Sequence, residues 1–204
     1  GIKRLARVVN VEARQLELVE ELADNVELPV QVTIASGFPK GDKLEFITQK
    51  VTELGASQIW AFPADWSVAN WDGKKLGKKV EKLEKIALGA AEQSKRNLVP
   101  SITLFEKKAD FLAQLEQFDR IVVAYEESAK EGEAAALLQS LTGLEAGSKL
   151  LFIFGPEGGL SPAEIESFTV KGAILAGLGP RILRAETAPL YALSAVSVVT
   201  ELMN

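Results

Sequence analysis

The sequence predicts an α/β domain with a mostly parallel sheet, preceded by part of a smaller β domain. Two observations support this class: 47% of the 204 residues are apolar, and from residue 30 onward apolar runs of strand type alternate with helical runs. We expect strands at residues 30–35, 58–62, 102–105, 120–124, 149–154 and 173–176. We expect helices at residues 43–54, 74–94, 109–118, 131–141, 162–168 and 188–203. This alternation is typical of βαβ units.

The ends of two helices carry recognisable local signals. Asp42 with Glu45, and Ser161 with Glu164, each have the spacing of a capping box, in which the first side chain and the later carboxylate satisfy free amides. Gly55 follows the first helix, where a glycine can adopt the left-handed conformation that ends it. Both helices therefore have predicted boundaries.

The first 28 residues differ from the rest of the chain. Short extended patterns at residues 4–9 and 15–19 suit a hairpin, and residues 22–29 are acidic and end in a proline, as a connector does. Two strands do not form a stable sheet alone. Because the chain begins at Gly1 without a methionine, we expect residues 1–28 to be part of a β domain, with residues 29–204 forming the main domain.

The composition removes several kinds of chemistry. The sequence has no histidine and no cysteine, which excludes Ser-His triads, thiol nucleophiles and nearly all zinc sites. No clustered aspartates resemble a calcium loop, so we predict no metal. No apolar run reaches the roughly 20 residues that span a bilayer, and the absence of cysteine suits the reducing cytoplasm. Catalysis must therefore use carboxylates, Lys, Arg, Tyr, hydroxyls or backbone groups.

Two loops attract attention because they follow the last two predicted strands, where ligands bind in α/β sheets. Residues 155–161 contain three glycines, and residues 177–187 contain two arginines and a carboxylate. Neither loop fits a common nucleotide fingerprint, since the first lacks the P-loop lysine and the second has Ile182 at the third glycine position. Each loop taken singly is more often a turn, but together they favour a binding site.

Five segments resemble, in order, the RsmE family of 16S ribosomal RNA uridine-N3 methyltransferases. They are residues 38–45 (FPKGDKLE), 49–55 (QKVTELG), 92–97 (EQSKRN), 155–161 (GPEGGLS) and 178–188 (LGPRILRAETA). The resemblance spans about residues 30–204 and implies a SPOUT fold with a C-terminal trefoil knot, an exception to the usual absence of knots. It also implies S-adenosylmethionine as cofactor, 16S ribosomal RNA or the small ribosomal subunit as partner, and a PUA-like N-terminal β-barrel that binds RNA. The chain departs from the usual pattern at Lys95, where glycine is common, at Ala185, and at residues 189–191.

The resemblance also implies roles for individual residues. Arg184 is the candidate that stabilises charge on the uracil carbonyls, and Glu157 and Glu186 are candidate bases or cofactor clamps that the sequence does not rank. Each carboxylate is equally compatible with a role at a helix terminus. The implied cofactor-binding residues are Phe154, Gly155, Pro156, Glu157, Gly158, Gly159, Leu178, Gly179, Ile182, Leu183 and Thr187.

The implied RNA contacts are basic. Lys40, Lys95, Arg96 and Arg181 are candidate phosphate ligands, and residues 71–97 carry eight Lys or Arg against four Asp or Glu in a chain of net charge −5. Ordinary solvation of a charged helix explains that excess as well. The three tryptophans Trp60, Trp66 and Trp71 are interpreted as packing residues outside the site.

Two further points concern assembly and alternatives. The predicted helix at 188–203 is apolar on most sides, which favours a homodimer, as the resemblance does, over burial within one chain. One alternative function is a related knotted methyltransferase acting on a ribose 2′-hydroxyl or another base. The other is a non-catalytic RNA-binding assembly factor that retains the fold.

Overall fold

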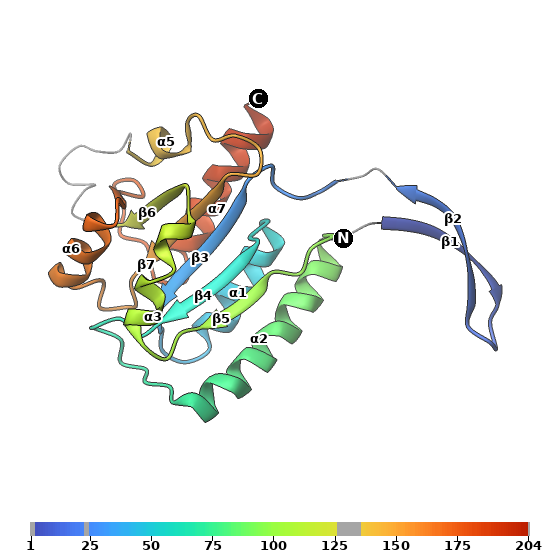
Figure 1. Ribbon diagram of the computed structural model, residues 1–204, viewed down its shortest axis with the longest axis horizontal. Helices are drawn as coiled ribbons and strands as arrows, with labels where there is room; N and C mark the ends of the chain where they lie inside the picture. The colour runs from blue at the N-terminus through green and yellow to red at the C-terminus, as the bar shows by residue number, and fades with distance from the viewer. Residues whose placement is uncertain (1–2, 23–24, 126–135, 204) are drawn as a thin grey trace.

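The computed structural model describes residues 3–22, 25–125 and 136–203. The strands β1 (Lys3–Asn10) and β2 (Gln15–Leu22) form an antiparallel hairpin that projects from the main body (Figure 1). Val8 pairs with Leu16 near its turn, where the amide of Ala13 donates to Asn10 Oδ1. The predicted hairpin is confirmed, with longer strands than expected.

The main body contains a six-stranded parallel sheet. Its strands are β3 (Gln31–Gly37), β4 (Gln58–Phe62), β5 (Ser101–Leu104), β6 (Arg120–Ala124), β7 (Lys149–Phe154) and β8 (Ile174–Ala176). Their spatial order is β5-β4-β3-β7-β6-β8, and all pairings in this sheet are parallel. The strand order reverses between β3 and β7, which is where an α/β sheet opens a crevice at the carboxyl ends of its strands.

Helices cover both faces of the sheet. On one face lie α1 (Lys43–Glu53), α5 (Ala136–Leu141) and α7 (Ala188–Ser197), whose apolar residues share a core with those of β3 and β7. On the other face lie α3 (Lys108–Leu112), the short 3-10 helix η1 (Leu115–Gln117) and α6 (Pro162–Val170). The long helix α2 (Gly73–Gln93) packs against α1 and β5. The alternation expected from the sequence is therefore confirmed.

The boundaries of the helices show where local signals suffice. Ser161 forms the full capping box with Glu164, as predicted, and Gly55 has a φ of +102° just past the end of α1. The capping box expected at Asp42 is wrong. Asp42 does precede α1, but its backbone is not extended (φ −99°, ψ 7°) and its side chain makes no capping hydrogen bond.

Three predicted helices differ in extent. The segment 109–118 divides into α3 and η1, and the predicted start at 131 lies outside the described residues, which show α5 from Ala136. The predicted helix at 188–203 divides into α7, which ends at Ser197, and a following π-helical turn, η2 (Val198–Leu202). Leu193 and Val196 of α7 are buried against the sheet, whereas Leu202 and Met203 are exposed. One side of this apolar segment is thus covered within the chain.

Candidate active site

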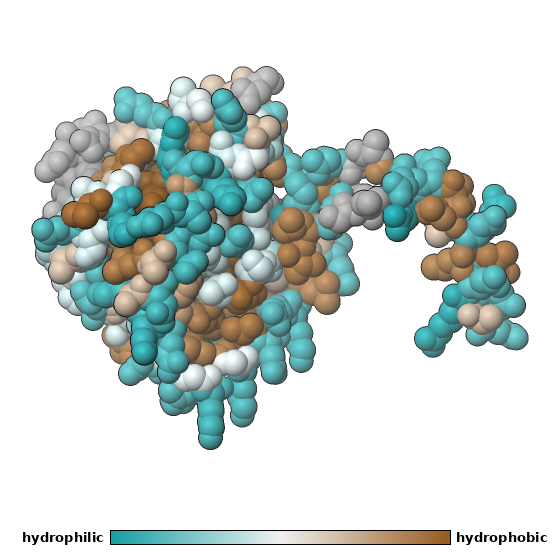
Figure 2. Space-filling view, in the orientation of Figure 1, coloured by the Kyte–Doolittle hydropathy of each residue, from teal (hydrophilic) through white to brown (hydrophobic). Residues whose placement is uncertain are grey.

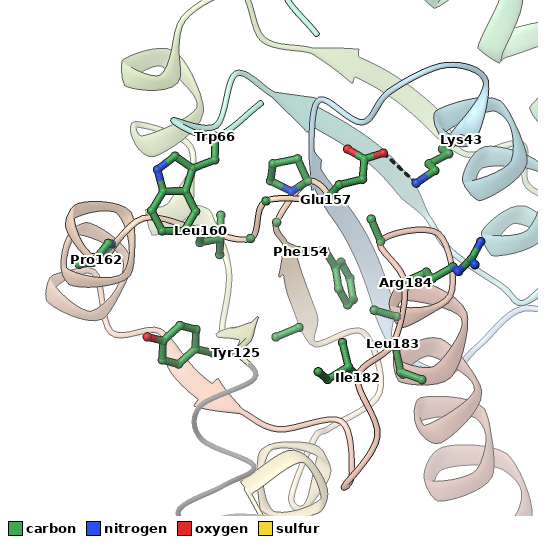
Figure 3. A pocket seen from close by; sticks show the side chains of 17 residues that line it. Lys43, Trp66, Tyr125, Phe154, Glu157, Leu160, Pro162, Ile182, Leu183 and Arg184 are labelled. Atoms are coloured by element: carbon green, nitrogen blue, oxygen red, sulfur yellow. Dashed lines mark ion pairs between the residues drawn. The ribbon is translucent and has the colours of Figure 1, made fainter. Parts of the chain in front are cut away.

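A pocket of about 700 Å³ opens at the carboxyl ends of β6 and β7 (Figure 3). Its volume is typical of small-molecule sites. Nine residues expected from the sequence line it, namely Phe154, Gly155, Pro156, Glu157, Gly158, Gly159, Ile182, Leu183 and Arg184. The two unusual loops therefore meet at one cavity, although they are separated along the chain by α6 and β8.

The loop after β7 approaches the pocket with its backbone. A Cβ on Gly155 would lie 2.7 Å from the backbone carbon of Gly159, too close for any side chain. Gly159 itself has a φ of +79°, and its amide donates to the carbonyl of Pro156 across a tight turn. A Cβ on Gly158 would lie 3.0 Å from the Cβ of Trp66, so this glycine makes room for a protein side chain.

The loop after β8 forms the opposite wall. The amides of Thr187 and Ala188 both donate to the carbonyl of Arg184 and lead into α7. Ile182 lines this wall with 78% of its surface exposed. Leu178, Gly179 and Thr187 do not line the pocket, and Leu178 packs against the core instead. Their cofactor contacts stay predictions.

A lysine at the start of α1 joins the two loops. Lys43 Nζ lies 2.8 Å from Glu157 Oε1 and 3.2 Å from Glu186 Oε2, and the Glu157 pairing is drawn in Figure 3. The backbone amide of Lys40 also donates to Glu157. The Oε2 atom of Glu186 is buried and accepts no hydrogen bond, so its contact with Lys43 is an ion pair only.

The pKa values in this cluster have the direction that ion pairing dictates. The hydrogen bond to Glu157 raises the pKa of Lys43, more than desolvation lowers it, and Glu186 adds to the increase. Partial burial works to raise the pKa of Glu157, but the hydrogen bonds from Lys43 and from backbone amides outweigh it and lower that pKa. A carboxylate stabilised in this way is a weak base.

Arg184 lies beside this cluster without joining it. Its side chain is 84% exposed, and its Nη1 atom is 4.0 Å from Glu186 Oε1, beyond hydrogen-bonding distance. Figure 3 shows the side chain leaving the loop on the side of Lys43 and α1 rather than crossing the pocket. The guanidinium charge therefore remains available at the mouth of the site.

Comparison with known proteins decides the family. The family model described as an RNA methyltransferase domain matches residues 26–197. The chain belongs to this RNA methyltransferase family. It is 53% identical over 187 residues to the ribosomal RNA small subunit methyltransferase E of Bacillus subtilis (strain 168), covering 92% of this chain and 73% of the relative.

Two further relatives extend the comparison. The enzyme of the same description from Mycobacterium tuberculosis (strain CDC 1551 / Oshkosh) is 30% identical over 203 residues, covering 98% of this chain and 76% of the relative. A crystal structure of the corresponding Neisseria gonorrhoeae enzyme, bound to S-adenosyl methionine, has a TM-score of 0.77 and 26% identity, covering 98% and 80% of the two chains. Both share the ribosomal RNA small subunit methyltransferase E name with the Bacillus enzyme.

Among the lining residues that sequence reasoning did not select, three have a polar or aromatic side chain. Lys43 comes from α1, Tyr125 follows β6, and Trp66 follows β4. Tyr125 could have been found from its place directly after a strand. Trp66, interpreted from the sequence as a packing residue, is 48% exposed, so that interpretation is wrong for this tryptophan.

Trp66 is held in place by a polar network beneath the pocket. The amide of Asp65 donates to Glu164, which is 1% exposed, and Lys108 pairs with both carboxylates. Ser161 Oγ donates to Asp65 Oδ2 at 2.5 Å. The capping box of α6 is thus also the anchor for the turn that carries Trp66.

The expected phosphate ligands fall into two groups. Lys40, Lys95 and Arg181 are exposed, as phosphate ligands must be. The expectation for Arg96 is wrong, because its side chain is only 3% exposed. Its guanidinium pairs with Glu27 and donates to the carbonyls of Thr52 and Ala56 at the end of α1. Arg96 is therefore a structural residue of this methyltransferase.

Two further findings concern metal sites and membrane-spanning helices in the described residues. Within residues 3–22, 25–125 and 136–203, no group of three or more acidic, histidine or cysteine side chains is arranged to hold a metal ion. No helix in the same residues is long and apolar enough to cross a membrane.

Proposed function

We propose that this chain transfers a methyl group from S-adenosylmethionine to N3 of a uridine in 16S ribosomal RNA, in the cytoplasm. The observation that carries the proposal is the pocket at the carboxyl ends of β6 and β7, walled by backbone on one side and by the Arg184 loop on the other. The names of the Bacillus and Neisseria relatives supply the substrate, and the Neisseria structure supplies the cofactor.

The residues of the pocket fit this cofactor. Gly155 and Gly159 pack closely against each other and let the backbone of the loop line the pocket, and Phe154, Ile182 and Leu183 offer apolar surface to an adenine ring. Free amides of the loop would recognise the polar edge of the ring. When bound, the cofactor supplies a methyl group on a positively charged sulfur as the electrophile.

The side chains of the site are better suited to stabilising negative charge on the uracil ring than to removing its proton as a strong base. Methylation replaces the N3–H bond by an N3–CH3 bond: the methyl group would come from the sulfonium of the cofactor, whose S–CH3 bond breaks to leave a neutral thioether, and the N3 proton would pass to a carboxylate or to water. The negative charge that develops on the base spreads onto the flanking carbonyl oxygens. We propose that Arg184, whose exposed guanidinium has no hydrogen-bonded carboxylate partner among the described residues, turns toward the base and stabilises that charge. Glu157, with its lowered pKa, is a poor base, so we propose that it orients Lys43 and the loop instead. Glu186 remains the candidate carboxylate for accepting the N3 proton.

The RNA backbone would contact exposed cations around the mouth of the pocket. Lys40 lies between β3 and α1, where its amide donates to Glu157, Arg181 lies on the loop after β8, and Lys95 follows the end of α2. Exposed lysines along α2, including Lys74 and Lys78, add to this positive surface. We propose that they position phosphates without reading sequence.

The proposal includes three structural features that the family resemblance implies: a trefoil knot, a homodimer and a PUA-like β-barrel. We propose, from the resemblance alone, that residues 177–187, which connect β8 to α7, form part of a trefoil knot. Exposed apolar residues on η2 support a homodimer. Apolar side chains on the hairpin, shown brown in Figure 2, support residues 1–28 as part of a PUA-like β-barrel.

The proposal is tested by mass spectrometry of ribosomal RNA treated with the protein and S-adenosylmethionine. We expect one methyl group on the uracil ring of a uridine at N3. A methyl group on ribose or on another base would favour the related knotted enzymes. Cofactor binding without transfer to any RNA would favour the non-catalytic assembly factor.

Cofactor binding has its own test. In Gly155→Ala the new Cβ collides with the backbone of Gly159, so the loop must shift at a cost of about 1–3 kcal/mol in strain, and we expect the shifted loop to bind the cofactor more weakly. Gly77→Ala is the matched control, because a Cβ on this α2 glycine meets no atom within 4 Å. Isothermal titration with S-adenosylmethionine should show weak binding for the first variant and ordinary binding for the second. Equal affinities would remove the glycine loop from the cofactor site.

A further inference from the structure

We infer that Lys43 is a positioning residue that keeps Arg184 free by occupying the two neighbouring carboxylates. The inference rests on the proposed function, because it assigns Arg184 the task of stabilising charge on the target base. It concerns α1, a part of the chain outside both loops of the pocket. The cluster of Lys43, Glu157 and Glu186 and the neighbouring Arg184 carry the argument.

The distances show that the carboxylates of Glu157 and Glu186 pair with Lys43 rather than with Arg184. Lys43 Nζ lies 2.8 Å from Glu157 and 3.2 Å from Glu186, whereas Arg184 remains 4.0 Å from Glu186. Charge-assisted hydrogen bonds form at about 2.7–2.9 Å, so a movement of about 1 Å would bring Arg184 onto Glu186. Without Lys43 nothing in the cluster would offset the attraction of Glu186 for the guanidinium.

The burial of the partners explains why this capture matters. The side chain of Glu186 is 18% exposed and that of Glu157 is 26% exposed, so both carboxylates need a cation nearby. Arg184, at 84% exposed, is the only other cation paired with either of them by distance in the described part of the chain. Lys43 stands at the start of α1 within ion-pair distance of both, which leaves the exposed guanidinium for the substrate.

Lys43 also links the two walls of the pocket, which is a separate structural role. Its loss would therefore have two kinds of effect, one through Arg184 and one through the shape of the site. The two are separable, because only the first depends on Arg184 being present. A double-mutant cycle between the two positions measures that dependence.

The experiment measures single-turnover methyl transfer at saturating RNA and cofactor for the wild type, Lys43→Met, Arg184→Ala and the double variant. We expect Lys43→Met to lower the rate by about tenfold or more, through partial loss of the charge stabilisation that Arg184 provides. The Lys43→Met effect should be clearly smaller in the Arg184→Ala background than in the wild type, because only the wall-linking part of it remains there. If the Lys43→Met effect has the same size in both backgrounds, Lys43 does not act through Arg184 and the inference is wrong.

Two further variants sharpen the result. Lys43→Arg keeps a cation between the carboxylates and should retain most of the rate. Adding Glu186→Gln to Lys43→Met removes the group that captures Arg184, so the rate should recover toward that of Glu186→Gln alone. A role limited to linking the walls predicts no such recovery, because the link is lost in both variants.

A readout without catalysis separates this inference from the proposed function. Phenylglyoxal modifies arginines that are not held by carboxylates, and mass spectrometry measures its reaction at Arg184. We expect rapid modification in the wild type and slower modification in Lys43→Met. Unchanged modification would overturn the inference even if the enzyme is active, and slower modification supports it even if the RNA substrate proves to be different.

Discussion

Two arginines of this methyltransferase lie beside a glutamate, and their surroundings give them opposite roles. Arg96 is 3% exposed and pairs with Glu27, whose carboxylate also accepts the amides of Asn97 and Leu98. Arg184 is 84% exposed and stays 4.0 Å from Glu186. The first guanidinium uses its donors to join the connector, α1 and the end of α2 (Figure 1). The second makes no hydrogen bond to Glu186, and we propose that its donors serve the substrate.

Removing the buried arginine should give the largest effect on folding. Arg96→Ala leaves Glu27 without its cation and two carbonyls of α1 without donors, and losing one partner of such a pair costs about 3–5 kcal/mol. Chemical denaturation measures the loss. Arg4→Ala is the control, since the Arg4 and Glu21 pair on the hairpin is more than half exposed and contributes at most about 1 kcal/mol. Similar losses for both variants would contradict the contrast.

Removing the exposed arginine should affect catalysis and spare stability. Arg184→Ala should lower the single-turnover rate by about 100- to 1000-fold, the usual cost of one donor at a developing negative charge. The free energy of unfolding should change by no more than about 0.5 kcal/mol, as for other surface substitutions. If saturating RNA restores the rate, Arg184 serves in binding and its catalytic role is wrong.

The sequence predicted the sheet better than the site, for physical reasons. The strands at 58–62, 120–124 and 149–154 have the predicted bounds, because each is a short apolar run that begins at a polar residue and is followed by Pro63, Tyr125 or Gly155. The capping box at Asp42 failed because backbone conformation decides whether a side chain reaches the free amides. The spacing of residues in the sequence does not determine the φ and ψ angles of the residue that precedes the helix.

The site residues show the same limit. The glycine loop was found because its spacing is local and follows a strand. Lys43 was missed because its partners are brought to it only by the packing of α1 against the carboxyl ends of the strands. Arg96 was misassigned because the sequence shows its charge but not the glutamate that buries with it.

The pairing of Glu27 predicts a loss of stability in acid. Burial works to raise the pKa of Glu27, but Arg96 and the backbone amides outweigh it and hold the pKa below the usual range for a glutamate. The stabilisation is therefore complete above the pKa of the unfolded chain and is lost as the pH falls through the lower folded value. Unfolding free energy measured from pH 6 down to pH 3 should fall less steeply in Glu27→Gln, which begins from a lower stability. Parallel curves would exclude Glu27 as a source of the acid sensitivity.

The smallest expected effect concerns Lys95, the neighbour of Arg96. Lys95 follows the end of α2 with a φ of +60°, and the amide of Arg96 donates back to the carbonyl of Ala91. This turn ends a helix in the left-handed conformation, which costs a residue with a side chain about 1 kcal/mol relative to glycine. Lys95→Gly should therefore stabilise the protein by about that amount, and Lys95→Ala should not. The two variants remove the same charge, so they should weaken RNA binding equally and reduce its salt dependence by about one phosphate contact if Lys95 binds phosphate. Unchanged RNA affinity in both, with the stability gain in glycine alone, would leave Lys95 as a residue of the helix end and place the RNA elsewhere.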